Sequence, residues 1–317
     1  MTEAARTVEG VQVERRAGAP PKPKSGGLRA SQTRLAWILL LPSLAIVAFV
    51  AIWPLIQTVY QSFTDAHLTG TLPTTTVGLK NYTDLLSDIA FRNSIVTTIK
   101  FALITVVAEF VLGMIIALVV NSNFRGRGLV RTAMLIPWAI ITVVSAQMWK
   151  WMFNDTYGVI NDLLYNKIGI PGHPIAWIAD PAYNFYTVAA VDIWKTTPFV
   201  ALLLLAGLQV IPGDVYEAAT VDGASKVRQF ISITLPLLRP AILVTLIFRT
   251  LDALRVFDVF YVMLGSSGSS QSMAIYDQEN IVQFGNLGYG AAISVAIFII
   301  IAVFVIAYTT FLKVEES

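Results

Sequence analysis

The sequence predicts an all-α membrane protein with six transmembrane helices. Of its 317 residues, 56% are hydrophobic and only 13% are charged, against about 25% charged in ordinary soluble domains. The hydrophobic residues gather in runs of roughly 20 or more, the length that crosses a hydrocarbon core of about 30 Å. Backbone polar groups find no water in lipid, so each run is expected to be helical. The six runs cover approximately residues 35–61, 95–120, 130–152, 184–210, 237–263 and 288–312.

Several kinds of chemistry are excluded by composition. The chain has no cysteine, which excludes a disulfide framework and a thiolate metal site. Its two histidines, His67 and His173, fall in predicted loops and are too few to bind zinc. A net charge of +2 does not favour nucleic acid. No nucleophile–base pair and no phosphate-binding G-x-x-x-x-G-K-[S/T] loop occurs, so we expect neither catalysis nor ATP binding in this chain.

Lysine and arginine residues predict the orientation, because they accumulate on the cytoplasmic side of membrane proteins. Fourteen of them lie in the two termini and in the second-to-third and fourth-to-fifth connections, against five in the other connections. Both termini are therefore expected in the cytoplasm. Residues 1–30 are rich in Ala, Gly, Pro and charge and predict a disordered tail, so that residues 31–317 form the membrane domain.

The connection between the fourth and fifth runs, residues 212–236, is polar and is expected to be a cytoplasmic helix–turn–helix. Asp214 follows a Pro-Gly pair as a candidate N-cap, and Glu217 lies three residues later, as in a capping box. These residues predict a helix over 215–221. Gly223 allows a sharp bend, after which a second helix is expected over 225–234.

Charged residues occur inside the predicted membrane helices, where they are costly and usually face a cavity or a partner. Arg249, Asp252, Arg255 and Asp258 follow one another at steps of three in the fifth run. These four side chains either line a translocation path or pair with one another as a structural ladder. Glu109, isolated in the second run, either pairs with an arginine of another helix or lies near a polar gap.

One face of the fourth run combines charged, hydroxyl and aromatic side chains, namely Asp192, Lys195, Thr196 and Phe199. Such a face offers hydrogen-bonding groups and a flat apolar surface, as a sugar requires. Alternatively, Lys195 extends toward the outer membrane surface. In the third run, Trp138 and Thr142 are expected on one helix face after a proline.

The order of residues in 217–236 resembles the cytoplasmic coupling loop of importer-type ABC transporter permeases. Glu-Ala-Ala is followed after three residues by Gly223, and after nine more by Ile-x-Leu-Pro. Asp222-Gly223-Ala224 resembles the form found in the carbohydrate-uptake branch. Four further stretches resemble carbohydrate permeases of the maltose-importer type: residues 128–137, 194–199, 205–212 and 248–258.

This resemblance implies the fold of a type I ABC importer permease and two functional regions. The residues that contact the ATPase would be Glu217, Ala218, Ala219, Asp222, Gly223 and Ala224. The sugar-facing positions of the family fall on Trp138, Thr142, Asp192, Lys195, Thr196, Phe199, Arg249, Ala253 and Val256, with Asp252 adjacent to them.

The same resemblance implies a permease for a carbohydrate, such as the disaccharides trehalose and maltose, in a bacterial plasma (inner) membrane. It would act with a second homologous permease, two ATP-binding subunits and an external solute-binding protein. ATP and Mg would be bound by the ATPase, and this chain would need no cofactor. Two alternatives remain: a glycerol-3-phosphate permease, with Lys195 and Arg249 as phosphate partners, and an ion-coupled secondary transporter that uses the charged fifth helix.

Overall fold

The computed structural model describes residues 25–70, 73–170, 172–266 and 270–311, which contain helices and no β-strand. The chain divides into two units, one ending at Leu55 and one beginning at Ile56, and each is described by itself. The first helical run comprises α1 (Ser25–Val47), a π-helical segment (Ala48–Ile52) and α2 (Trp53–Gln61). Residues 25–30 of the expected tail are therefore helical, and residues 1–24 lie outside the described part.

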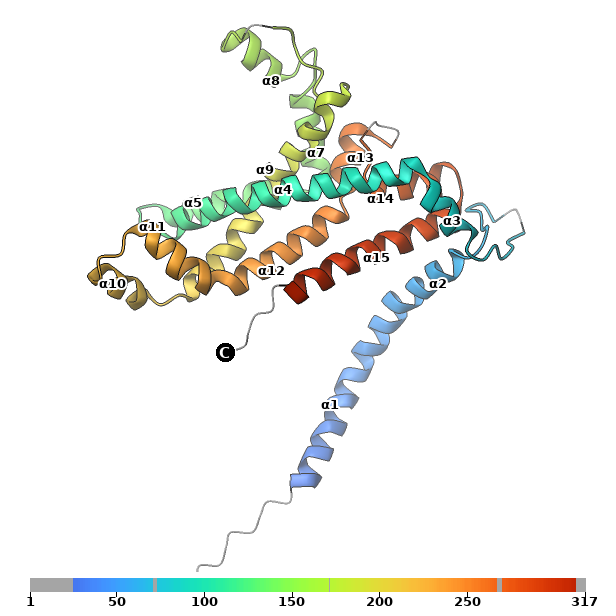
Figure 1. The fold of residues 1–317 in the computed structure, drawn as a ribbon, viewed down its shortest axis with the longest axis horizontal. Helices are drawn as coiled ribbons and strands as arrows, with labels where there is room; N and C mark the ends of the chain where they lie inside the picture. The colour runs from blue at the N-terminus through green and yellow to red at the C-terminus, as the bar shows by residue number, and fades with distance from the viewer. Residues whose placement is uncertain (1–24, 71–72, 171, 267–269, 312–317) are drawn as a thin grey trace, which may run out of the picture. The chain divides into compact units, whose positions relative to one another are not determined.

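The second unit is a bundle of long helices with short helices at its ends (Figure 1). In chain order the α-helices are α3 (Lys80–Ser87), α4 (Ile89–Asn121), α5 (Arg127–Met134), α6 (Ile136–Ala139), α7 (Thr142–Met152), α8 (Val159–Asn161), α9 (Pro181–Val210), α10 (Gly213–Val221), α11 (Lys226–Gln229), α12 (Leu235–Leu254), α13 (Asp258–Leu264), α14 (Met273–Gln278) and α15 (Leu287–Phe311). Three further segments are π-helical: Asp162–Lys167, Phe230–Thr234 and Glu279–Gln283.

Five helical runs among the described residues are long and apolar enough to cross a membrane, and a bent pair brings the number to six. The bent pair is the third predicted run. Its halves, Arg127–Ala139 and Thr142–Met152, meet at 88°, because Ile140 and Ile141 between them have extended backbone conformations. The prediction of a continuous third helix, with Trp138 and Thr142 on one face, is therefore wrong.

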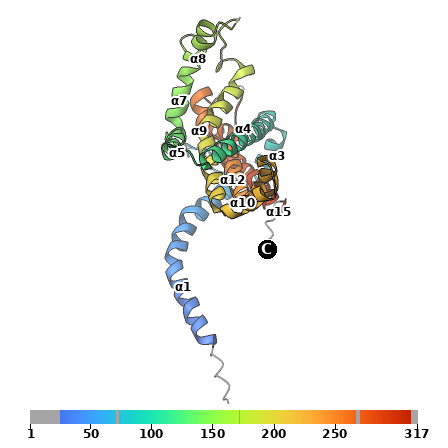
Figure 2. The same ribbon diagram turned by 90° about the vertical axis from the view of Figure 1, so that its left-hand side faces the viewer.

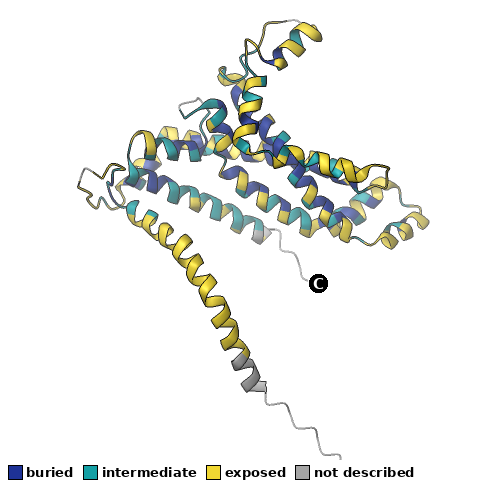
Figure 3. Cartoon of the chain, turned by 180° about the vertical axis from the view of Figure 1, so that it is seen from behind, coloured by how far each residue is buried: buried dark blue, intermediate teal, exposed yellow. Residues whose placement is uncertain are grey.

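Helices α4 and α9 pack along one another and form the centre of the bundle. Phe101 and Ala117 of α4 and Val188 and Leu204 of α9 are buried, and Figure 3 shows that the buried residues follow the inner faces of these helices. The outer face of α4 carries exposed residues such as Leu103. Apolar side chains directed outward are what lipid contact requires.

Glycines permit the closest helix contacts. A Cβ atom added at Gly113 of α4 would lie 2.6 Å from Val200 Cγ1 of α9. A Cβ atom added at Gly207 of α9 would lie 2.4 Å from Ala241 Cβ of α12. Small residues allow helix backbones to approach closely in membranes, and these two glycines bring α4, α9 and α12 together.

The two ends of the bundle differ. Helices α10 and α11 lie at one end, α3 and α14 lie at the other, and α7 and α8 project away from the bundle in both views (Figures 1 and 2). At the α14 end, Asp88 accepts backbone hydrogen bonds from Ala90 and Phe91 of α4. It also accepts hydrogen bonds from the hydroxyls of Tyr276 and Tyr289. Burial by itself would raise the pKa of Asp88, but these hydrogen bonds outweigh it, and the pKa is lowered.

Asp277 of α14 is a carboxyl group at the same end with incomplete hydrogen bonding. The Ser294 hydroxyl donates to its Oδ2 at 2.6 Å, whereas its Oδ1 is buried without a partner. Burial raises the pKa of Asp277 to about 6, although the Ser294 hydrogen bond opposes the shift.

Replacing Gly113 by alanine should destabilise the chain by about 1–3 kcal/mol, because the added methyl group overpacks the α4–α9 contact. Gly128→Ala is the matched control. Gly128 is also helical, but a Cβ there would meet nothing within 4 Å, so the control should be neutral or slightly stabilising. Thermal unfolding in detergent measures the stability of both variants. Equal unfolding temperatures for Gly113→Ala and Gly128→Ala would contradict the close contact at Gly113.

The stability of the chain should depend on pH through Asp277. Since its pKa lies above the ordinary value of an aspartate, about 3.9, the folded chain binds the proton more tightly than the unfolded chain. The protonated group therefore contributes stability that is fully present below about pH 4 and is lost as pH rises through about 6. The difference in unfolding temperature between Asp277→Asn and wild type should be more positive at pH 7.5 than at pH 5, by on the order of 2–5 °C. The exposed carboxylate variant Asp84→Asn should show a smaller change, and a pH-independent difference for Asp277→Asn would refute this role.

Candidate functional site

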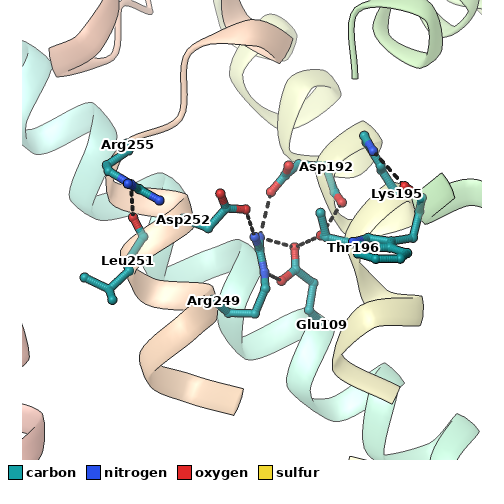
Figure 4. Close-up of polar contacts among 9 residues, drawn as sticks. Glu109, Asp192, Lys195, Thr196, Arg249, Leu251, Asp252 and Arg255 are labelled. Atoms are coloured by element: carbon teal, nitrogen blue, oxygen red, sulfur yellow. Dashed lines mark hydrogen bonds and ion pairs between the residues drawn. The ribbon is translucent and has the colours of Figure 1, made fainter. Parts of the chain in front are cut away.

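The second unit contains a cavity of about 240 Å³ where α6, α7, α9, α12 and α13 converge. Among the residues that line it are nine of the ten predicted for substrate contact: Trp138, Thr142, Asp192, Lys195, Thr196, Arg249, Asp252, Ala253 and Val256. These residues come from five separate segments of the chain. Figure 4 shows how the charged members face one another.

Arg249 is the centre of the site, and its guanidinium meets three carboxyl groups. Its Nε and Nη2 donate to Glu109 at 2.5 and 2.8 Å. Nη2 also donates to Asp192 at 3.0 Å, and Nη1 donates to Asp252 at 2.6 Å. Four hydrogen bonds therefore hold a side chain that is only 2% exposed. We call Arg249, Glu109, Asp192 and Asp252 the Arg249 cluster.

The Arg249 cluster joins three helices, and the hydroxyl group of Thr196 also contacts it. Glu109 belongs to α4, Asp192 to α9, and Arg249 to α12. Thr196 Oγ1 lies 2.5 Å from Glu109 Oε1 and 2.6 Å from the carbonyl oxygen of Asp192. Of the two possibilities for Glu109, pairing with an arginine of another helix is the one observed.

Lys195 binds the break in the third run. Its ammonium group donates to the carbonyl oxygens of Trp138 at 3.3 Å and Ile140 at 2.9 Å. These carbonyls lie where the helix ends and lack the usual helical donors. Lys195 is 8% exposed, so the alternative that it extends to the outer membrane surface is wrong.

An aromatic pair forms one side of the cavity. Trp138 lines the cavity and is 44% exposed. Phe199 stacks on it, with ring centroids 5.6 Å apart and an angle of 15° between the planes. Phe199 is not among the lining residues. Its contact with substrate stays a prediction, and in this structure it supports the Trp138 ring.

The predicted ladder of four charges on the fifth helix is only partly present. Arg249 and Asp252 pair, but α12 ends at Leu254, and Arg255 donates to the carbonyl oxygen of Leu251 instead. After this end the chain contributes further lining residues that were not predicted as substrate contacts: Arg255, Phe257, Asp258 and Val259. The steps of three between the charged residues fit a continuous helix and give no sign of its end, so Phe257 and Val259 could not be found from the sequence.

The polar connection 212–236 forms the expected helix–turn–helix, with a different start. Helix α10 begins at Gly213, and Pro212 precedes it with φ −63° and ψ 139°. No side chain caps this helix. The predicted capping box of Asp214 and Glu217 is therefore wrong, because proline restricts φ and fixes the chain direction one residue earlier.

The turn between α10 and α11 is held by Gly223 and Gln229. Gly223 has φ +76°, a conformation that favours glycine. The buried Gln229 side chain donates to Thr220 Oγ1 at 3.0 Å and to the Ala224 carbonyl oxygen at 3.1 Å. Ser225 caps α11.

The six predicted ATPase-contacting residues differ in exposure. Glu217, Ala218, Asp222 and Gly223 are exposed, and Ala224 is half-buried. Ala219 is 9% exposed, and its carbonyl oxygen accepts a hydrogen bond from the Ala224 amide. Ala219 therefore packs inside the turn, which corrects the expectation that it meets another surface.

The comparisons with known proteins agree with this architecture. Residues 109–314 match the family described as "Binding-protein-dependent transport system inner membrane component". A trehalose/maltose transport system permease protein, MalF, of Thermococcus litoralis is 41% identical over 89% of this chain and 94% of its own length. The trehalose transport system permease protein SugA of Mycobacterium tuberculosis is 38% identical over 87% and 88%. The sulfoquinovosyl glycerol transport system permease protein SmoG of Agrobacterium fabrum is 41% identical over 83% and 85%.

A solved structure shares the fold. It is a bacterial ABC transporter involved in the import of the acidic polysaccharide alginate, and it matches with a TM-score of 0.78 and 21% identity. The match covers 92% of this chain and 99% of that chain. The six-span helical architecture, the family match and the similarity to three curated permeases lead to one assignment. The chain belongs to the family of inner membrane components of binding-protein-dependent transport systems.

Proposed function

We propose that this chain is one of two permease subunits of an ATP-driven importer for a carbohydrate, most simply a disaccharide such as trehalose or maltose. The second permease is a homologous chain, and an external solute-binding protein delivers the sugar. Two ATP-binding subunits bind ATP and Mg and supply the energy. The protein lies in the bacterial plasma (inner) membrane, with both termini in the cytoplasm.

The observation that carries this proposal is the composition of the cavity wall. The Trp138 ring, backed by Phe199, offers a flat apolar surface to the face of a sugar ring. Asp252 offers a carboxylate whose side chain is 65% exposed and whose Oδ2 is held by Arg249. Carboxylate oxygens accept hydrogen bonds from hydroxyl groups, so the two surfaces match the two faces of a sugar.

The contacts of Arg249 and Lys195 disfavour these two residues as the phosphate partners that a glycerol-3-phosphate permease would need. A phosphate site requires a guanidinium or ammonium group with free donors. Four hydrogen bonds to protein carboxyl groups engage Arg249, and Lys195 donates to two backbone carbonyls. The family to which the chain belongs disfavours the ion-coupled alternative. Two of the relatives are named for trehalose transport or trehalose/maltose transport, which supports a disaccharide.

The coupling role is proposed for residues 212–236. Their exposed residues include Glu217 and Asp222, and the apolar Val221 is 88% exposed. The motif spacing and the excess of lysine and arginine in the same connections support a cytoplasmic position facing the ATPase.

Replacing Asp252 by asparagine should raise the KM for disaccharide uptake about tenfold, because a hydrogen bond to a charged group is replaced by one to a neutral amide. Uptake by the complete transporter in proteoliposomes measures this. The control is Asp84→Asn, an exposed carboxylate of α3 outside the cavity, which should leave KM unchanged. An unchanged KM in Asp252→Asn would place the sugar elsewhere.

Replacing Gly223 by aspartate should weaken co-purification with the ATP-binding subunit encoded beside this gene and reduce ATP-driven uptake. The new side chain would project from an exposed turn where a Cβ meets nothing within 4 Å, so the fold itself should survive. Gly70→Asp is the matched control, since Gly70 also has a positive φ (+62°) and open surroundings. If no ATP-binding subunit is retained even by the wild type, the importer proposal fails.

A further inference from the structure

Glu109 is a membrane carboxyl group that does not line the cavity. It is 0% exposed and lies in the interior of α4. A charged group at this depth is costly and is retained where it has a function. The polar contacts of Glu109 are with Arg249 and Thr196, so any effect on substrate has to act through those side chains.

The geometry of the Glu109–Arg249 pair determines what the guanidinium can do. Two parallel N–H groups of Arg249, on Nε and Nη2, meet the two oxygens of Glu109. A bidentate pair of this kind fixes the plane of the guanidinium as well as its position. In that plane two of the three remaining N–H groups reach Asp192 and Asp252, which both line the cavity.

We infer that Glu109 is a positioning residue that sets the charge preference of the cavity. It holds Arg249 against the protein wall, so that the guanidinium orients Asp192 and Asp252 and is neutralised by carboxyl groups of the chain. Arg249 thereby attracts an anionic sugar less than an unpaired guanidinium would, which leaves Arg255 as the exposed cation of the cavity wall and shifts the preference toward uncharged sugars. This inference rests on the proposed function and names the residue that selects the class of sugar.

A purely structural role for Glu109, as a tie between α4 and α12, makes a different prediction. Loss of a structural tie would weaken the binding of all substrates alike, or would reduce the amount of folded protein. Loss of the positioning role releases the positive charge of Arg249 toward the cavity, where one carboxyl partner fewer now balances it. The affinity for an anionic sugar should then rise relative to the affinity for an uncharged one.

The test compares wild type with Glu109→Gln, an isosteric change that removes the charge. The complete transporter is purified without its solute-binding protein, so that binding reports the cavity alone. Labelled trehalose or maltose is displaced either by the unlabelled disaccharide or by a disaccharide in which one ring carries a carboxylate. We expect the ratio of the two inhibition constants to shift toward the anionic sugar on the order of tenfold in Glu109→Gln. Glu109→Asp, which keeps the charge, should restore much of the wild-type preference.

An unchanged ratio in a folded Glu109→Gln transporter overturns the inference. If that variant does not assemble, the double variant Glu109→Gln/Arg249→Gln takes its place, because it removes both charges of the pair. Asp192 and Asp252 then lack the cation that balances and holds them, so the double variant should bind the anionic sugar more weakly than wild type and should also lose affinity for the disaccharide. Wild-type affinity in the double variant would also overturn the inference. The proposed function fails separately, if the wild-type transporter binds neither trehalose nor maltose.

Discussion

One buried guanidinium holds the centre of this membrane protein together. Arg249 is in contact with carboxyl groups from α4, α9 and its own helix α12. In a bilayer a charged group without partners is strongly disfavoured, so these helices have to meet at this point. The glycine contacts at Gly113 and Gly207 let the backbones approach closely enough for the short side chain of Asp192 to reach the guanidinium.

The chemistry of the cavity follows from the same constraint. Arg249 and Lys195 are engaged by protein oxygens. The groups left to face a substrate are carboxylates, a hydroxyl, an aromatic ring and the exposed guanidinium of Arg255. Lys195 also makes the broken third span possible, because its ammonium group binds the carbonyls released at Trp138 and Ile140. The break in turn brings Trp138 and Thr142 to the cavity from two different helices.

The sequence predicts features that depend on local patterns. Run length and hydropathy locate the spans, and the spacing of Asp192, Lys195 and Thr196 places them on one face of a single helix. Contacts between distant residues cannot be found in this way. Glu109 and Arg249 are 140 positions apart, and no local pattern in one sequence joins them. The break at Ile140 lies within an apolar stretch, where hydropathy gives no information on backbone direction. The end of α12 at Leu254 lies among charged residues whose steps of three fit a continuing helix equally well. The missing cap at Asp214 shows that Pro212 outweighs a local side-chain preference.

The Arg249 cluster is connected along the chain to the region proposed to meet the ATPase. Residues Lys226–Leu264 form one helical run that begins in α11 and contains Arg249. A displacement of α11 therefore reaches Arg249 through backbone hydrogen bonds, and the π-helical segment Phe230–Thr234 is the place along this path where helical geometry is already irregular. Arg249 cannot leave its carboxyl partners without exposing unpaired charges in the membrane. These ion pairs therefore tie α4 and α9 to α12, the helix that continues from the proposed coupling region.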